Sequence, residues 1–380
     1  MIDAEVLRRR LAERLAERGD LRSEAWRRAV ERVPRHLLVP RFYRQEDDGY
    51  RLVDGSDPGQ REEWLRAVYD PQESLVTEHD PATGVPTSSA TMPSIVLALL
   101  EALDVQPDHR VLEVGTGSGY SAALLCERVG SANVTTIDIG AEVVEQARRR
   151  LAEIGHRPHL VCGDGFEGYA AHAPYDRVLA MVGLDRVPRA WVEQTRPGGV
   201  ILATLPSMTA RLERRQDGSA QGRFVGGFGF MAMRGHAPLH LPESRARALV
   251  QGEGEERAPS VDVLPMLRGE RIPGFWGLAR LLLMPFDTTV AIDRQRTAIV
   301  EATDRSWVLI DLERNRVRQG GPRRLWDALE DLYLLLEHRG RPSRDRFGLT
   351  VRPDGRQLVW LDDPDAGPRW ELPVRAAGRG

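Results

Sequence analysis

Apolar and polar positions alternate regularly in the middle of the chain, from about position 95 to position 205. Short apolar runs predict buried strands at 110–114, 133–137, 158–161, 176–181 and 199–205. Amphipathic spacing predicts helices at 95–103, 120–129, 142–154 and 189–195. Strands that alternate with helices in this way indicate a doubly wound, Rossmann-like α/β sheet with helices on both faces.

The flanking regions have a different character. The first 45 positions carry apolar residues at helical spacing, whereas residues 45–90 are rich in Asp, Gly, Pro and Ser and predict loops with short extended pieces at 65–69 and 74–77. After Pro206 the alternation stops, and strand-like runs surround one strong helix near the C-terminus. We therefore predict three domains: an N-terminal helical and loop-rich extension at 1–80, an α/β domain at 81–240 and a C-terminal α+β accessory domain at 241–380.

Composition narrows the class of protein. The 380 residues are 41% hydrophobic, which is enough for cores in several domains, and 53 basic residues against 56 acidic ones give a net charge of −3. A chain without an overall cationic field is not predicted to bind nucleic acid. Cys126 and Cys162 are too few for a disulfide framework or a cysteine zinc site, and no apolar run approaches the length that spans a membrane. We expect a cytoplasmic protein with no membrane contact.

No metal site is predicted. His156 and His159 lie three positions apart, but Pro158 prevents a regular helix there and no acidic ligands accompany them.

The segment VLEVGTGSGY at residues 111–120 carries the clearest chemical signal. An apolar strand containing Glu113 is followed by Gly115, Gly117 and Gly119 before a helix. Glycines at a strand-to-helix turn let the backbone turn sharply and let a ligand approach the N-terminus of the helix. The pattern indicates a nucleotide-like ligand.

Two common nucleotide loops do not fit this segment. A dinucleotide fingerprint requires a third glycine at position 120, which is Tyr120. A phosphate-binding P-loop requires Gly-Lys-Ser/Thr, and the chain contains no lysine. NAD is therefore disfavoured, and ATP hydrolysis by a P-loop is excluded.

The acidic-x-Gly-x-Gly-x-Gly loop resembles motif I of class I S-adenosylmethionine-dependent methyltransferases. In that family the loop holds the amino-acid end of the cofactor, a carboxylate after the second strand binds the ribose, and a polar residue after the third strand binds adenine. The resemblance assigns S-adenosylmethionine as cofactor and predicts that it is bound by Glu113, Gly115, Thr116, Gly117, Ser118, Gly119, Tyr120, Asp138, Ile139, Gly163, Asp164 and Gly165.

Further phrases resemble the protein L-isoaspartyl O-methyltransferase family over about residues 65–235. Residues 85–100, VPTSSATMPSIVLALL, are similar to the segment that precedes motif I in that family, and residues 174–199 are similar to the segment between its fourth and fifth strands. The family's usual serine two positions before the proline is here Thr91, with Ser88 and Ser89 just upstream. The resemblance gives one of these three hydroxyls the substrate-facing role, with Thr91 preferred by its register to Pro93, although such residues also serve as helix caps.

The additional C-terminal residues resemble the layout of actinobacterial members of the family that act beside ribosomal-peptide pathways with ATP-grasp ligases. That resemblance implies methylation of an aspartate or isoaspartate carboxylate in a cyclised precursor peptide, followed by collapse of the ester to an aspartimide. The alternative within the same class is repair of isoaspartate in damaged proteins. An alternative of another class is a noncatalytic peptide-binding module. The oligomeric state and the precursor peptide are not predicted by the sequence.

Overall fold

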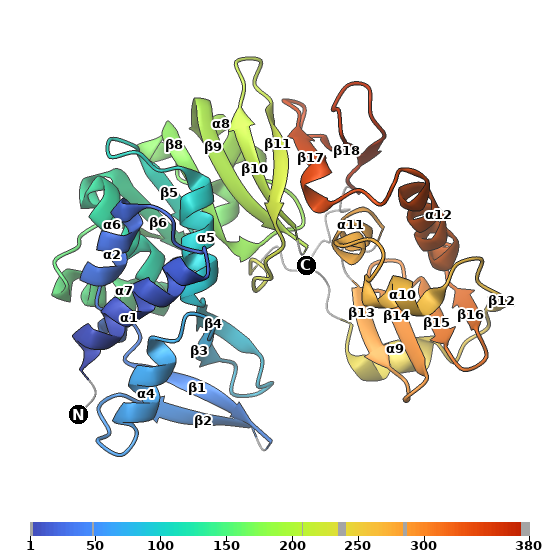
Figure 1. Cartoon of the computed structure of the whole chain (residues 1–380), viewed down its shortest axis with the longest axis horizontal. Coiled ribbons are helices and arrows are strands. Elements are labelled where there is room, and N and C mark those ends of the chain that lie inside the picture. Colours follow the sequence, from blue (N-terminus) through green and yellow to red (C-terminus); the bar gives the residue numbers. More distant parts are fainter. Residues whose placement is uncertain (1–2, 48, 207, 235–240, 284–286, 374–380) are drawn as a thin grey trace. The chain divides into compact units, whose positions relative to one another are not determined.

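The computed structural model describes residues 3–47, 49–206, 208–234, 241–283 and 287–373. The chain divides into two compact units (Figure 1). Unit 1 comprises Met1–Val182, Pro188–Ala203 and Arg211–Gly218. Unit 2 comprises Gly183–Val187, Thr204–Ala210 and Ser219–Gly380. The boundaries of the three predicted domains stay a prediction, because this division follows compactness and does not separate functions.

Unit 1 begins with helices that the sequence caps well. Asp3 accepts a hydrogen bond from the Glu5 amide at the start of α1, and Ser23 accepts one from the Trp26 amide at the start of α2. The N-terminal helices are α1 (Ala4–Glu17), α2 (Glu24–Arg32), α3 (Arg35–Leu38) and α4 (Arg61–Val68). A small antiparallel sheet of order β2-β1-β3-β4 joins them, with strands β1 (Arg41–Glu46), β2 (Gly49–Asp54), β3 (Leu75–His79) and β4 (Pro86–Ala90).

The main sheet of unit 1 has the predicted parallel centre. Strand β5 pairs in parallel with β6 and β8, and β6 pairs in parallel with β7, within the order β9-β8-β5-β6-β7. The strands are β5 (Val111–Val114), β6 (Val134–Asp138), β7 (His159–Cys162), β8 (Tyr175–Gly183) and β9 (Thr195–Leu205). The helices are α5 (Pro93–Leu103), α6 (Tyr120–Val129), α7 (Ala141–Glu153) and α8 (Arg189–Gln194), with short 3₁₀ turns at Ser131–Asn133, Gly165–Glu167 and Ala170–His172. All four residues of β5 are buried, as expected for a central parallel strand. The Rossmann-like fold class is confirmed.

Unit 2 contains two antiparallel arrangements and four helices among its described residues. In one, β17 (Phe347–Val351) pairs with β11 (Ala220–Gly226) on one side and with β18 (Gln357–Leu361) on the other. Strand β18 also pairs with β19 (Arg369–Glu371). The second sheet has the order β12-β16-β15-β14-β13, with bounds Glu255–Arg257, Arg316–Gly320, Trp307–Asp311, Arg296–Glu301 and Asp287–Ala291. The helices are α9 (Glu243–Leu249), α10 (Val263–Arg268), α11 (Phe275–Leu282) and α12 (Leu325–His338), with a 3₁₀ turn at Arg344–Arg346. Strand β10 (Met208–Arg214) contributes residues to both units.

A core of its own supports the second sheet of unit 2. The buried members of this core are Ala246, Val250, Val290, Ala298, Val300 and Trp307. The apolar residues of α9 cover the faces of β13 and β14, which is the usual way for an antiparallel sheet to bury one face. The predicted α+β character of the C-terminal part is therefore observed.

Two local predictions were wrong. The piece at 65–69, predicted as extended, lies largely in helix α4, and the region 45–90 contains β2 and β4 in addition to β3, which corresponds to the extended piece predicted at 74–77. These strands lack an apolar signal because they are polar: Arg41–Glu46 pairs along its whole length with Gly49–Asp54, and ion pairs such as Arg51 with Glu46 support the pairing. The alternation of strands with helices does stop after Pro206, but strands β10 and β11, which follow there, were not predicted.

Candidate functional site

The loop between β5 and α6 needs backbone conformations that favour glycine. Gly115 has φ +97° and Gly117 has φ +49°, both in the left-handed region. A Cβ on Gly115 would lie 2.8 Å from Val182 Cγ1, and one on Gly117 would lie 3.4 Å from the Ser89 carbonyl oxygen. The glycines thus permit both the turn and its close approach to neighbouring backbone.

Asp138, at the end of β6, fixes this loop. Its Oδ2 accepts a hydrogen bond from the Gly117 amide at 3.2 Å, and its Oδ1 accepts one from the Gly140 amide at 3.0 Å. The Asp138 side chain is half-buried at this position. The side chain therefore joins the carboxyl ends of β5 and β6, where a parallel sheet binds its ligands.

Glu113 is a fully buried carboxyl group beneath the loop. Thr136 Oγ1 donates to its Oε2 at 2.7 Å, and hydrogen bonding by Ser121 and Thr136 favours the charged form, while the buried Oε1 has no close hydrogen-bond partner among the described residues. Burial raises the pKa of Glu113 to about 7. A buried acceptor without a donor is uncommon and needs an explanation. The ammonium of an amino-acid ligand would supply a matching positive charge.

The third strand end continues the same edge of the sheet. The Gly163 amide donates to the Asp138 carbonyl at 3.0 Å, and Asp164 accepts a hydrogen bond from the Phe166 amide at 2.9 Å. Beside them, Ile139 is 44% exposed, a large apolar side chain at a strand end. The predicted cofactor residues therefore lie at the carboxyl ends of three neighbouring strands and the start of α6: Glu113, Gly115, Thr116, Gly117, Ser118, Gly119, Tyr120, Asp138, Ile139, Gly163, Asp164 and Gly165.

The three predicted acceptor-side hydroxyls fall in different places. Ser88 and Ser89 are in strand β4, and Thr91 follows it. Ser88 is buried, and Thr77 Oγ1 donates to its Oγ at 2.9 Å. None of the three caps helix α5, because Met92 is the N-cap residue and no side chain caps that end. Simple helix capping therefore does not explain these hydroxyls.

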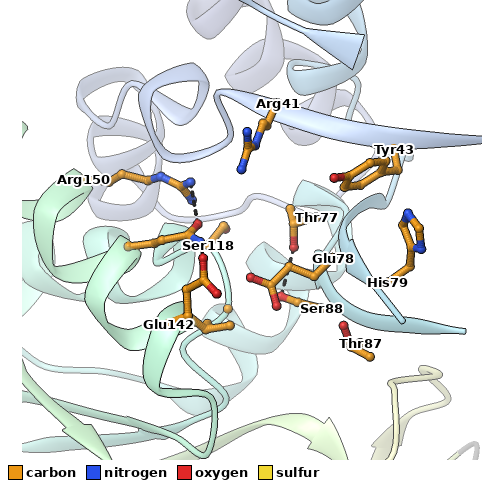
Figure 2. Close-up of a pocket in the computed structure, with 13 residues that line it drawn as sticks. Arg41, Tyr43, Thr77, Glu78, His79, Thr87, Ser88, Ser118, Glu142 and Arg150 are labelled. Carbon is orange, nitrogen blue, oxygen red and sulfur yellow. Dashed lines mark hydrogen bonds between the residues drawn. The ribbon is translucent and has the colours of Figure 1, made fainter. Parts of the chain in front are cut away.

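Ser88 lines a cleft together with the glycine loop (Figure 2). The cleft has a volume of about 310 Å³. Its lining residues are Arg41, Tyr43, Thr77, Glu78, His79, Thr87, Ser88, Gly117, Ser118, Glu142, Val143, Gln146 and Arg150. Ser89 and Thr91 are not among them. The structure thus brings one predicted substrate-facing hydroxyl and two predicted cofactor-loop residues to the same cleft.

Comparison of this chain with known proteins identifies its family. A model of the protein-L-isoaspartate(D-aspartate) O-methyltransferase family matches residues 60–236. The protein-L-isoaspartate O-methyltransferase of Methanopyrus kandleri is 33% identical over 252 residues, which cover 64% of this chain and 99% of that relative. The chain belongs to the protein-L-isoaspartate O-methyltransferase family.

Two other matches agree with this family. The protein-L-isoaspartate O-methyltransferase of Thermococcus onnurineus is 34% identical over 242 residues, 62% of this chain and 96% of the relative. A solved structure of a protein-L-isoaspartate O-methyltransferase matches with a TM-score of 0.56 at 22% identity, over 94% of this chain and 100% of that chain. This likeness shows a shared fold. Membership confirms the predicted class, an S-adenosylmethionine-dependent carboxyl O-methyltransferase.

Most of the cleft was not predicted from the sequence. Arg41, Glu78 and Arg150 belong to β1, β3 and α7, which the fold brings to one cleft. Glu142 alone offered a signal, because it follows Asp138 closely at the start of α7. Charged residues on three separate elements have no spacing rule that sequence reasoning can use.

A buried arginine ties the acceptor segment to the rest of unit 1. Arg35 is 0% exposed, and its Nε donates to the Val68 carbonyl at 2.9 Å while its Nη2 donates to the Thr91 carbonyl at 3.2 Å. Its guanidinium also lies 4.8 Å from the ring centroid of Tyr120, the first residue of α6. Burial lowers the pKa of Arg35. Arg35 thus joins three segments that surround the cofactor loop.

Features outside this site add no chemistry to it. His156 lies 3.3 Å from the Glu127 carboxylate, and His159 packs against His172 with ring centroids 4.0 Å apart. No group of three or more His, Cys, Asp or Glu side chains suited to a metal occurs in the part of the chain that the structure describes. Within that same part, no helix has the length and apolar character needed to cross a membrane.

Proposed function

We propose that this chain transfers a methyl group from S-adenosylmethionine to the free carboxylate of an isoaspartyl residue in proteins or peptides. The observation that carries this proposal is the cleft that Ser88 shares with Gly117 and Ser118 of the glycine loop. Family membership supplies the reaction class, and the cleft supplies a place where acceptor and donor could meet. Repair of isoaspartate in damaged proteins, which uses the activity for which the family is named, is the role that we propose first.

The residues fit the cofactor. Glu113 Oε1 lacks a close donor, Asp138 presents a carboxylate at a strand end, and Gly115 and Gly117 adopt the left-handed conformations that the loop needs before α6. When bound, S-adenosylmethionine supplies an electrophilic methyl group on a positively charged sulfur. In this proposal Glu113 faces the ammonium of the cofactor, Asp138 binds its ribose, and Asp164 with Ile139 holds its adenine.

The acceptor side needs positioning more than acid–base chemistry. A carboxylate with an ordinary pKa near 4 is already ionised at neutral pH and is itself the nucleophile. Because Ser88 Oγ accepts a hydrogen bond from Thr77, its own hydrogen is left to donate to one carboxylate oxygen. This would orient the other oxygen toward the methyl group, and orientation of this kind accounts for much of the rate of such reactions.

The product then reacts without further help from the enzyme. Methyl transfer makes a methyl ester, and the neighbouring backbone amide nitrogen attacks the ester carbonyl. Methanol leaves, and the ring that forms is a succinimide, also called an aspartimide. Repair of isoaspartate and maturation of a cyclised peptide share this chemistry and differ only in the substrate.

Maturation of a cyclised ribosomal peptide is the second candidate. One observation favours it: the curated relatives match only 64% and 62% of this chain, so unit 2 residues beyond the match are available to recognise a particular peptide. The solved isoaspartate methyltransferase structure nevertheless covers 94% of the chain. The extra residues therefore do not distinguish the two substrates, and repair remains the first proposal.

The test is transfer of labelled methyl from S-adenosylmethionine to three peptides: an isoaspartyl peptide, its aspartyl counterpart and a side-chain-cyclised aspartyl peptide. Repair predicts methylation of the first alone, and maturation predicts methylation of the third. Binding of S-adenosylhomocysteine without turnover of any peptide would favour the noncatalytic module instead.

A matched pair of variants ties turnover to the glycine loop. Gly117→Val places a branched side chain at φ +49° against the Ser89 carbonyl, and we expect it to abolish methylation. Gly155→Val makes the same change at φ +86° in open space after α7, and we expect it to remain active. Equal activity in the two variants would show that the loop does not hold the cofactor.

A further inference from the structure

Two guanidinium groups face the cleft without a carboxylate partner among the described residues. Arg150, on α7, donates from Nη1 to the Leu38 carbonyl at 3.3 Å and from Nη2 to Gln146 Oε1 at 2.8 Å, and both acceptors are neutral. The guanidinium of Arg41, on β1, forms no hydrogen bond or ion pair with any described residue, although its charge is felt by Asp54 on the paired strand β2. Figure 2 shows both side chains on the same side of the cleft.

The neighbouring arginines of the same small sheet are all engaged. Arg44 is 3.0 Å from Glu63 and 3.1 Å from Glu73, and Arg51 is 2.8 Å from Glu63. Ion pairing is therefore the usual condition of an arginine in this region. Arg41 and Arg150 depart from it together, at one place.

The positive charges of Arg41 and Arg150 also repel each other. Burial lowers the pKa of Arg150, and the nearby positive charges of Arg41 and Arg149 lower it further, although Glu78 and Glu153 act in the opposite direction. Two like charges that share a half-enclosed space are stabilised by an anion between them. The arrangement is therefore that of an anion site.

The acidic residues of the cleft do not neutralise the arginines directly. Gln146 Nε2 donates to Glu142 Oε1 at 3.1 Å, so one glutamine separates Glu142 from Arg150 along helix α7. Eight residues of helix correspond to ~12 Å. In Figure 2 the carboxylates of Glu78 and Glu142 lie below the two arginines, with Glu78 near Ser88, and they would repel an anion toward the arginine side.

The reacting carboxylate is not a suitable occupant of this site. Two guanidinium groups would hold its electron pairs and reduce its nucleophilicity, whereas Ser88 can orient it with a single neutral donor. The cofactor is not a suitable occupant either, because neither Glu113, to which its amino-acid end is assigned, nor Asp138 and Asp164, to which its ribose and adenine are assigned, lines the cleft. A second carboxylate of the peptide is a suitable occupant, because it neither takes part in the reaction nor belongs to the cofactor.

We infer that Arg41 and Arg150 form a subsite for an acidic side chain close to the modified residue in the peptide substrate. This inference rests on the proposed function, since it names the class of peptide that the same cleft prefers. Guanidinium groups suit this role because their planar donors match a carboxylate with two hydrogen bonds.

The test compares isoaspartyl peptides that differ at one position, from two residues before to two residues after the modified one, with Glu, Gln or Lys there. We expect the wild-type kcat/KM for the best Glu peptide to exceed that for its Gln counterpart about tenfold, which corresponds to ~1.4 kcal/mol. Arg41→Gln and Arg150→Gln should each reduce this ratio below about threefold. Arg149→Gln, on the exposed face of the same helix, is the control and should keep the ratio.

A binding measurement separates the arginine subsite from the proposed methyltransferase function. Fluorescence anisotropy of the labelled Glu and Gln peptides, with S-adenosylhomocysteine bound to the full chain, should show the same ratio without turnover. Absence of methylation with a retained binding ratio would refute the proposed function and support the subsite. Equal affinities for Glu and Gln peptides, an undiminished ratio in both arginine variants, or a parallel loss of S-adenosylhomocysteine affinity would overturn the subsite.

Discussion

The buried carboxyl of Glu113 gives a pH dependence that can be calculated from the structure. Its side chain is fully buried, and burial raises its pKa from 4.5 to about 7. In the unfolded chain the group titrates near its ordinary value. Between these two values the folded protein holds a proton that the unfolded chain has already released, so the unfolding free energy falls as the pH rises.

The size of the effect follows from the two pKa values. Stability from this group is fully present below pH ~4.5 and is lost as the pH rises through about 7. Each pH unit across that interval corresponds to ~1.4 kcal/mol, so the total loss is about 3 kcal/mol. Glu113→Gln keeps the size of the side chain but removes its titration, and it should therefore remove this slope.

The measurement is urea unfolding of the cofactor-free protein from pH 5 to pH 8.5, followed by circular dichroism. The difference in unfolding free energy, variant minus wild type, should become more positive by about 2.5 kcal/mol across this range, because other titrating groups cancel in the difference. Glu153→Gln, an exposed change on α7, should show no such trend. Parallel curves for wild type and Glu113→Gln would refute the argument that Glu113 is protonated in the folded protein.

Cofactor binding provides an independent check of the same charge. If the ammonium of the ligand lies against Glu113, ionisation of the carboxyl becomes favourable and binding releases a proton near pH 6.5. Calorimetry of S-adenosylhomocysteine binding in two buffers with different ionisation enthalpies measures this release. Glu113→Gln should bind without releasing it.

Two further predictions concern the acceptor segment. Ser88→Ala should lower the single-turnover methylation rate about tenfold or more with unchanged S-adenosylhomocysteine affinity. Ser89→Ala and Thr91→Val should have smaller effects. Wild-type rates in all three variants would show that backbone groups align the acceptor carboxylate. Arg35→Met leaves the carbonyls of Val68 and Thr91 without their buried donor, so urea unfolding should show a loss of about 3 kcal/mol or more, and a loss below about 1 kcal/mol would show that water replaces the guanidinium.

The sheet and the cofactor loop were predictable because their determinants are local. The apolar run at Val111–Val114 is long enough for one buried strand, and the glycines after it adopt the left-handed conformations that such a turn needs. Acidic residues after successive parallel strands must come together at one edge of a sheet, so the strand pattern alone is enough to place Asp138 and Asp164 with Glu113.

The N-terminal sheet was not predictable for a physical reason. Its strands are polar on much of their surface and are stabilised by one another and by ion pairs such as Arg44 with Glu63. Such strands lack the apolar alternation that marks a half-buried sheet. The cleft depends on this sheet, so Arg41, Glu78 and Arg150 could not be assigned to one site from the sequence.

The preference between Ser88 and Thr91 shows how one local assignment changes a chemical prediction. Counting back from Pro93 places Thr91 at the family's serine position, and that count remains a valid interpretation of the sequence. In the structure, however, strand β4 extends through Ala90, and its side chains alternate between two faces. Ser88 and Ala90 are buried while Ser89 is half-buried, so Ser88 is directed to the Thr77 hydroxyl and the cleft. Thr91 instead offers its carbonyl to Arg35, and a residue whose backbone fixes the segment can be required for activity without touching the substrate.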